Sequence, residues 1–568
     1  MGRDGRASVG LAAMTAVLLV AATAMSARAQ DASSSPPAPA SPPAAPSSAP
    51  PPSLAPVDWI VDSTADAADA QPGDGICATA TNACTLRAAV QEAAADAGAR
   101  VIELPAGVFG LRAGDPREDA SVDGDLDIAG TLEVRGAGAD ATSISGGRTS
   151  RLFQVLTGGS LTLRSLALVD GSSSDGKAGA VDNAGRLVIE DARVEGNTAT
   201  GPGAILSSGS LVVRRTIFID DRADRDGGAV QVLAGTASLE DSDFERDRSN
   251  GTGGALLVSG GSVSVTRTRF SLNEAYGGAA IAAVGGSTTV DASTFDQGRA
   301  FLGGALYVRQ ASGSTSLAVT ASSFARNVAT APGLGGGAMA VLGGHVQVDA
   351  STFAANTSSA AGGGAVSLSS GSLAMLDSTF DGDIAVASGD ILSVGAGRPR
   401  KRALPYDLSI GWSTLVAGAR PAIGVDKRRI KGDRTTITGS MVLSQAPAGA
   451  CTGAPPTSGG GNIGDDSCGL TAVTDRPATQ PSPTLVPGAS AMPGVQPSSA
   501  PGTDAWAWLV GPLADNGGPT LTRLPVEGSI AVDATAGVAG CPAVDQRGVP
   551  RPQGPACDAG AVEVGPTP

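Results

Sequence analysis

The feature that most constrains the fold of this chain is a pattern that recurs along residues 179–383. Each copy contains three short apolar segments separated by glycine or polar residues, and the third segment closes on an apolar side chain. Successive copies place a phenylalanine there at steps of 26, 26, 25, 29, 29 and 27 residues: Phe218, Phe244, Phe270, Phe295, Phe324, Phe353 and Phe380. Earlier, degenerate copies place Leu168 and Val194 at the same position. A fixed period of this length is typical of architectures built from stacked repeats.

The apolar segments favour β-strands over helices. Residues 255–258 and 263–265 alternate with a period of two, whereas a helical repeat needs at least about ten residues at helical spacing. Pairs such as Gly253-Gly254 suit the corners, because glycine accepts positive φ. The sequence therefore predicts an all-β fold, a single-stranded, right-handed parallel β-helix. This pectin-lyase-like solenoid would have about 12 turns, stacked at the ordinary strand spacing of about 4.8 Å.

A second column of related side chains follows three residues after the closing apolar position. Gly298 interrupts this column, whose members are Asn197, Asp221, Asp247, Asn273, Asn327, Asn356 and Asp383. Stacked side chains of this kind can hydrogen-bond along the solenoid axis, or they can form a row of calcium ligands. We favour a structural ladder, since asparagine and aspartate are ordinary turn residues and the dense Gly-Asp nonapeptide of calcium-binding repeats is absent. No cofactor is therefore expected, with Ca²⁺ as the alternative.

The N-terminal residues have the features of an exported protein. Residues 1–29 predict a secretory signal peptide, with basic Arg3 and Arg6, an apolar run over 9–24 and an Ala-Arg-Ala cleavage site. The run is short for a spanning helix, so we expect no membrane-spanning segment in the mature chain. Residues 30–56 are almost wholly serine, proline and alanine and predict a disordered linker.

The cysteine pattern agrees with export. Six cysteines form three local pairs: Cys77 with Cys84, Cys451 with Cys468, and Cys541 with Cys557. An even number and close pairing predict three disulfides. Zinc is disfavoured, because the chain has no CxxC motif and His345 is its only histidine. The predicted location is extracellular or on the cell surface.

Residues 57–100 are predicted to form an N-terminal cap. An alternating strand over 57–61 precedes the first cysteine pair, and Thr85 then N-caps a helix from Leu86 to about Ala97. The apolar face of this helix would seal the open end of the solenoid. Residues 101–445 are assigned to the β-helix. Residues 446–568 are assigned to a C-terminal module with a low-complexity loop at 477–501.

Two segments carry a family resemblance. Residues 84–89, Cys-Thr-Leu-Arg-Ala-Ala, resemble the Cys-Ser-Leu-Arg-Glu-Ala motif of bacterial CSLREA-domain proteins, with Thr85 and Ala88 departing from it. The stretches 101–107, 124–128 and 132–138 continue this likeness. The tail resembles the choice-of-anchor Q module at four stretches: 511–522, 545–548, 551–552 and 557–563. The resemblance implies a bacterial surface β-helix protein.

The charge of the chain indicates which classes of partner it can bind. The net charge of −15 and the isoelectric point near 4.6 disfavour nucleic acid. Two basic clusters lie about one repeat apart and can stack as one patch for an anionic ligand: Arg398, Arg400, Lys401, Arg402, Lys427, Arg428, Arg429 and Lys431. Two solvated loops explain these clusters more simply.

Fragments of enzyme motifs are present but scattered. Asp220-Asp221 lies more than one hundred residues before His345, so these side chains would fall several turns apart and cannot flank one glycosidic bond. Asp123, Asp125 and Asp127 alternate and could hold a cation, although a solvated strand edge explains them equally. We assign no catalytic residue and no metal ligand.

The sequence thus predicts an exported, non-enzymatic scaffold with an adhesion-like or glycan-contacting role. Its expected partners are extracellular polysaccharides or components of a host or cell surface. The alternative is a polysaccharide lyase or glycoside hydrolase acting on an acidic polysaccharide.

Overall fold

The computed structural model describes residues 55–565 except 97, 116–117, 311–312, 333, 360–361, 387–388, 396–403, 429 and 480–503. The chain divides into two units, of which Met1–Leu54 lies outside the described residues. The signal peptide expected at 1–29 and most of the linker expected at 30–56 therefore fall outside them. The second unit, Ala55–Pro568, contains all elements named below.

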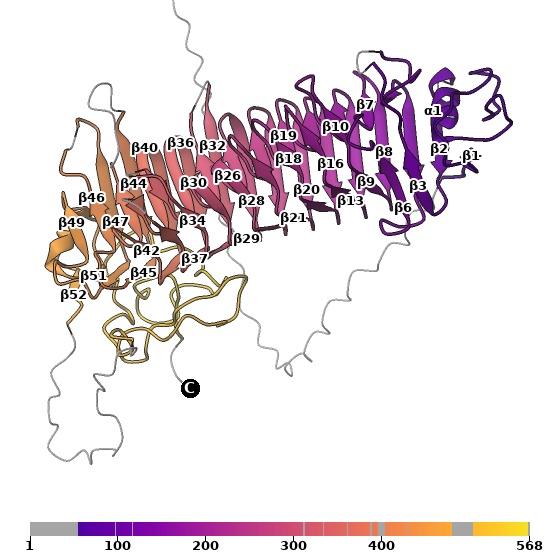
Figure 1. The fold of residues 1–568 in the computed structure, drawn as a ribbon. Coiled ribbons are helices and arrows are strands. Elements are labelled where there is room, and N and C mark those ends of the chain that lie inside the picture. The colour runs from indigo at the N-terminus through magenta and orange to yellow at the C-terminus, as the bar shows by residue number, and fades with distance from the viewer. Residues whose placement is uncertain are drawn as a thin grey trace, which may run out of the picture. The chain divides into compact units, whose positions relative to one another are not determined.

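The predicted fold class is confirmed: the unit is an all-β parallel solenoid of about 12 turns (Figure 1). Its largest sheet has 26 strands, and most turns contribute two of them. These strands are β1 (Trp59–Ile60), β2 (Ala99–Glu103), β4 (Leu126–Ile128), β5 (Thr131–Arg135), β7 (Phe153–Val155), β8 (Ser160–Arg164), β11 (Val181–Asn183), β12 (Arg186–Glu190), β15 (Ile205–Ser207), β16 (Ser210–Arg214), β19 (Val230–Val232), β20 (Thr236–Glu240), β23 (Leu256–Val258), β24 (Ser262–Thr266), β27 (Ile281–Ala283), β28 (Gly286–Asp291), β31 (Leu306–Val308), β32 (Thr315–Thr320), β36 (Met339–Asp349), β40 (Val366–Leu376), β43 (Leu392–Val394), β44 (Tyr406–Gly411), β46 (Ile423–Val425), β47 (Arg434–Thr438), β49 (Cys451–Gly453) and β50 (Thr457–Ser458).

The other faces of the solenoid are a 15-stranded and a narrow 9-stranded sheet. The first contains β3 (Gly107–Gly110), β6 (Thr142–Ser145), β9 (Ala167–Val169), β13 (Arg193–Glu195), β17 (Ile217–Ile219), β21 (Asp243–Glu245), β25 (Arg269–Ser271), β29 (Thr294–Asp296), β33 (Ser323–Ala325), β37 (Thr352–Ala354), β41 (Thr379–Asp381), β45 (Thr414–Ala417), β48 (Met441–Ser444), β51 (Ile463–Gly464) and β52 (Arg476–Pro477). The second contains β10 (Ser172–Ser173), β14 (Thr198–Ala199), β18 (Arg222–Ala223), β22 (Arg248–Ser249), β26 (Glu274–Gly277), β30 (Arg299–Leu302), β34 (Val328–Ala329), β38 (Thr357–Ser358) and β42 (Ile384–Ala385). A small sheet pairs β35 (Gly335–Gly336) with β39 (Gly362–Gly363).

The repeated phenylalanines form one continuous stack inside the solenoid. Adjacent rings lie in register on neighbouring turns, with centroids 4.5 to 5.0 Å apart and ring planes within 12° of parallel. All seven are buried among valine, leucine and isoleucine side chains from the other sheets. The step from one phenylalanine to the next is therefore one turn of the solenoid.

The N-terminal end is closed by helix α1 (Leu86–Ala95). The Thr85 hydroxyl accepts the N–H of Ala88 at 3.1 Å, as expected of an N-cap. The helix ends two residues before the expected Ala97, because Asp96 has extended backbone angles. The Arg87 guanidinium is buried; it pairs with Asp66 at 2.6 Å and donates to the carbonyl oxygen of Gly124 at 2.7 Å. This arginine fastens the helix to the loop that precedes it and to the connection between β3 and β4.

The stacked strands extend beyond the expected end of the β-helix at 445. Strands β49 to β52 continue the solenoid to Pro477, with the short 3-10 helix η1 (Asp466–Cys468) between them. Residues 504–565 consist mostly of turns and pack on the outer face of the 15-stranded sheet (Figure 1). Gln546 spans two turns there, because its amide donates to Thr352 Oγ1 at 2.9 Å and accepts from Thr379 Oγ1 at 2.6 Å.

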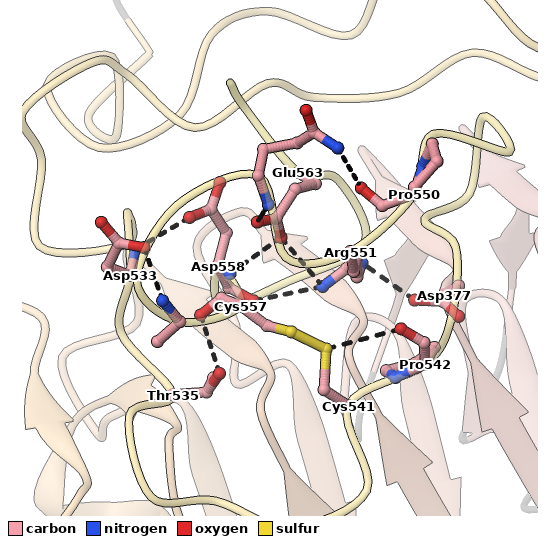
Figure 2. Close-up of a disulfide and its surroundings, with 12 residues drawn as sticks. Asp377, Asp533, Thr535, Cys541, Pro542, Pro550, Arg551, Cys557, Asp558 and Glu563 are labelled. Carbon is pink, nitrogen blue, oxygen red and sulfur yellow. Dashed lines mark hydrogen bonds and ion pairs between the residues drawn. A yellow bond between two sulfur atoms is a disulfide. The ribbon is translucent and has the colours of Figure 1, made fainter. Parts of the chain in front are cut away.

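Three disulfides join the cysteines as pairs of sequence neighbours: Cys77–Cys84, Cys451–Cys468 and Cys541–Cys557. Figure 2 shows the last of these beside the buried side chain of Arg551. Arg551 donates to the carbonyl oxygens of Asp558 and Gly560 and lies 3.3 Å from the Asp377 carboxylate of the solenoid. The C-terminal segment is thus held to the solenoid by a buried ion pair as well as by apolar packing.

Candidate functional site

The Asn/Asp column lies inside the solenoid. The carboxylate of Asp221 accepts the backbone N–H and the side-chain amide of Asn197 at 2.8 and 2.9 Å, and Asp383 accepts the same pair from Asn356. Every member of the column is buried, so the column faces the core and not solvent. Burial raises the pKa of Asp221 and of Asp383 to about 8, which favours the uncharged acid. These side chains hold neighbouring turns together.

A second polar ladder runs beside the first and was not anticipated from the sequence. In most of these turns a serine or threonine hydroxyl accepts the N–H of its counterpart in the preceding turn and donates to the carbonyl oxygen two residues before it. Its members include Ser242, Thr268, Ser293, Ser322, Ser351, Ser378, Ser413 and Ser440. Aligning the repeats on their phenylalanines would have revealed it, because the hydroxyl falls two residues earlier in copy after copy.

The fragments of hydrolase motifs are not brought together. Asp221 is buried in the ladder, while Asp220 is exposed and pairs with Arg246 at 3.1 Å. His345 lies on β36 and its Nδ1 forms a hydrogen bond with Ser372 Oγ at 2.8 Å. Among the described residues no ion pair or hydrogen bond joins His345 to a carboxylate. These side chains do not form an acid–base pair.

The three N-terminal aspartates have separate partners. Asp125 is buried and pairs with the buried guanidinium of Arg151 at 2.7 Å. Asp127 accepts the N–H of Ser121 at 2.8 Å, and burial raises its pKa to about 7. Asp123 accepts the N–H of Asp115 at 2.9 Å. Within the described ranges, no group of three or more His, Cys, Asp or Glu side chains could hold a metal ion.

The two basic clusters are described only in part. Arg398, Arg400, Lys401, Arg402 and Arg429 lie outside the described residues. Lys427, Arg428 and Lys431 are exposed, and Arg428 pairs with Asp426 at 3.0 Å. One joint patch therefore stays a prediction.

The most distinctive exposed feature is an aromatic pair on the 9-stranded sheet. Tyr276 on β26 and Phe301 on β30 are 49% and 37% exposed, and their ring centroids lie 5.0 Å apart. Strands β26 and β30 pair in parallel with Ala275 opposite Ala300, so the two rings occupy equivalent outward positions on adjacent turns. We call Tyr276 and Phe301 together the aromatic platform. The sequence gives one indication of this pair. Tyr276 and Phe301 are 25 residues apart, the same distance along the chain as from Phe270 to Phe295.

The aromatic platform rests on a packed base. Leu302 follows Phe301 on β30, and its side chain is buried on the opposite side of the strand. There it joins an apolar cluster that lies on the outer face of the large sheet. This cluster includes Leu257, Ala282, Leu302, Tyr307, Ala331 and Ala340. Gly277 packs closely at this point, because a Cβ there would lie 3.2 Å from the Tyr307 ring, which would have to shift slightly. The platform therefore sits on well-packed turns and not on a free loop.

Charged side chains border the platform. Glu274 shares the outward face of β26 with Tyr276, and Arg299 shares that of β30 with Phe301. Glu274 pairs with Arg248 of the preceding turn at 3.3 Å. In register, Glu274 has Arg248 on one side and Arg299 on the other, so neither neighbour supplies a second carboxylate. The arrangement can bind a flat ring and an anion, but it lacks the carboxylate pair of a glycosidase.

Comparisons with known proteins give matches at the level of fold. No protein-family model and no curated protein matches this chain. Solved structures that match include the catalytic domain of a GH87 α-1,3-glucanase in complex with tetrasaccharides, at 11% identity and a TM-score of 0.38, covering 70% of each chain. Another is a mannuronic acid specific polysaccharide family 6 lyase from human gut microbiota, at 10% identity and a TM-score of 0.28, covering 63% of this chain and 76% of the lyase. At these values neither match bears on the chemistry of this chain.

Proposed function

We propose that this chain is an exported, non-enzymatic β-helix scaffold that contacts glycans through the aromatic platform. The observation that supports this function is the exposure of two stacked rings in a chain with only 3% aromatic residues. The phenylalanines of the repeat are otherwise buried in the core stack. Exposed aromatic side chains that neighbour each other are characteristic of binding surfaces, where they supply much of the affinity.

The shape of the surface favours an extended ligand over a small molecule. Tyr276 and Phe301 lie side by side along the solenoid axis, and the strands on either side continue the same sheet. Small-molecule sites are usually concave and enclose most of the ligand, which a sheet face does not. The apolar face of a sugar ring can instead lie on an aromatic ring while the rest of the polymer follows the sheet.

Export is supported by the cysteines and by the two resemblances. The disulfides of the structure are of a kind that persists in oxidising compartments. In the part of the chain that the structure describes, no helix is long and apolar enough to cross a membrane. The likeness to CSLREA-domain and choice-of-anchor Q proteins adds a bacterial surface setting, and the role we propose there is adhesion or glycan contact.

The double substitution Tyr276→Ala and Phe301→Ala is expected to lower glycan affinity at least about tenfold, because aromatic anchors typically contribute about 2 kcal/mol or more. Affinity electrophoresis and titration calorimetry with polygalacturonate, alginate and a neutral glucan would measure it. Ile384→Ala is the matched control, since Ile384 is also exposed on the 9-stranded sheet, and it should bind as the wild type does.

Two results would overturn this function. The first is unchanged glycan binding by the double variant while its fold, measured by circular dichroism, is intact. The second is turnover: new reducing ends or unsaturated products, formed reproducibly with or without calcium, would make the chain a hydrolase or a lyase.

A further inference from the structure

Many arginines on this solenoid are paired with an acid on the neighbouring turn. Arg214 contacts Glu190 on one side at 3.1 Å and Glu240 on the other at 3.2 Å. The same rule holds at the corners, where Arg215 pairs with Asp191 and Arg267 with Asp241, both at 2.6 Å. Stacked turns bring equivalent positions close together, so alternating charges avoid repulsion between like charges.

The outer row of the 9-stranded sheet brings arginines together without this alternation of charge. In register, Arg222 on β18 lies opposite Arg248 on β22, followed by Glu274 and then Arg299. Four successive turns thus carry three guanidinium groups and one carboxylate, in a chain whose net charge is −15. Like charges directly opposite each other are destabilising, so this row carries an excess of positive charge that its one carboxylate does not balance.

The single carboxylate in the row, that of Glu274, already forms an ion pair. Glu274 pairs with Arg248, which leaves Arg222 and Arg299. Neither of these two forms an ion pair among the described residues. Both are exposed, and Arg299 lies two residues before Phe301 on the same face of β30. An unpaired guanidinium therefore stands directly beside the aromatic platform.

We infer that this surface selects an acidic polysaccharide, with sugar rings on Tyr276 and Phe301 and anionic groups on Arg299 and, further along the axis, on Arg222. This inference rests on the proposed function. Guanidinium groups form two parallel hydrogen bonds with a carboxylate or with an oxygen-rich anion such as sulfate, which makes arginine suited to either. The row runs along the solenoid axis, so a linear polyanion lying along it can meet charge on several turns.

The test compares a polymer with its uncharged form on the same backbone, and adds a polymer whose only anionic group is sulfate. Wild-type protein is titrated with polygalacturonate, with its methyl ester, which keeps the sugar rings and removes the charge, and with dextran sulfate. We expect binding of polygalacturonate to exceed that of the ester about tenfold or more and to weaken as salt rises. The sulfated polymer shows whether carboxylate or sulfate is preferred.

The variants are Arg299→Gln and the double change Arg222→Gln with Arg299→Gln. Each lost charge-assisted contact should lower affinity for the acidic polymer roughly tenfold and leave affinity for the ester unchanged. Arg186→Gln is the control, because Arg186 is an exposed arginine on β12 of the large sheet and away from the platform. It should bind the acidic polymer as the wild type does.

The outcomes separate the two proposals. Equal binding of acid and ester, unaffected by the arginine changes but abolished by Tyr276→Ala with Phe301→Ala, would overturn the acidic preference and keep the glycan-binding function. Binding that neither the arginine nor the aromatic changes affect, or no binding of any polymer, would overturn both.

Discussion

Replacing Phe295 with alanine is expected to lower the free energy of unfolding by about 3–5 kcal/mol. Phe295 lies in the middle of the core stack, 5.0 Å from Phe270 and 4.6 Å from Phe324, and is 1% exposed. Its removal takes away buried apolar area and leaves a cavity between two rings whose turns are fixed by backbone hydrogen bonds. Because each turn of a solenoid contacts only its neighbours, the loss weakens the coupling of the two halves of the stack.

Urea or thermal unfolding of the purified protein measures this effect. The matched control is Phe301→Ala, which removes the same side chain from an exposed position and should change the free energy of unfolding by less than about 1 kcal/mol. Equal destabilisation by the two changes would contradict a core built around one phenylalanine per turn.

The second large effect concerns pH and the acids of the Asn/Asp column. Asp383 accepts two hydrogen bonds from Asn356 through Oδ1, while its Oδ2 is buried without a hydrogen-bond partner. Asn327 and Asn356 occupy the same column and use their NH₂ groups to donate to the carbonyl oxygens of Phe295 and Phe324. An uncharged acid at 383 can donate through Oδ2 as those amides do, whereas a carboxylate would bury an unpaired charge.

Burial raises the pKa of Asp383 from 3.8 to about 8, and the nearby Asp381 and Asp390 act in the same direction. Because the folded-state pKa lies above the unfolded one, the folded protein binds more protons than the unfolded chain between these two values. This contribution to stability is complete below about pH 4 and is lost as the pH rises through about 8. Asp221, whose pKa is also raised to about 8, acts with the same sign.

Asp383→Asn should remove part of this pH dependence. At pH 8 the variant is expected to be more stable than the wild type, on the order of a few kcal/mol at about 1.4 kcal/mol per pKa unit, and at pH 4 the two should agree closely. The reverse change Asn356→Asp should add pH dependence and lower stability at pH 8. Unfolding curves collected from pH 4 to pH 9 would show this, and a variant less stable than the wild type at pH 8 would contradict an uncharged Asp383.

The period of the sequence predicts the core well because core packing repeats with it. The step between phenylalanines is one turn, so the sequence alone is enough to place Phe218 to Phe380 and the asparagines that follow them. The serine ladder follows the same period. It was missed because an isolated serine such as Ser322 is an ordinary turn residue, and its burial depends on the turns above and below.

Features that depend on contacts distant in sequence could not be predicted. Gln546 binds Thr352 and Thr379 from more than 160 positions away, and no local pattern encodes that docking. The last strands of the solenoid, β49 to β52, are two or three residues long and carry no phenylalanine, so the repeat signal ends before the fold does.

The aromatic platform belongs to the same class of features. Residues Glu274–Gly277 alternate, but only the stacking of the turns decides which side faces solvent and which side covers Tyr307. The 25-residue spacing of Tyr276 and Phe301 was visible in the sequence, whereas their exposure was not.

The most direct test of the glycan-contact account is hydroxyl-radical footprinting with mass spectrometry, with and without a saturating polysaccharide. Both platform rings are exposed and should react readily in the free protein. The account predicts that bound polysaccharide protects the peptides containing Tyr276 and Phe301, and leaves the exposed Ile384 on the same sheet as reactive as before. Strong binding with full reactivity at Tyr276 and Phe301, and protection on another face of the solenoid, would contradict it.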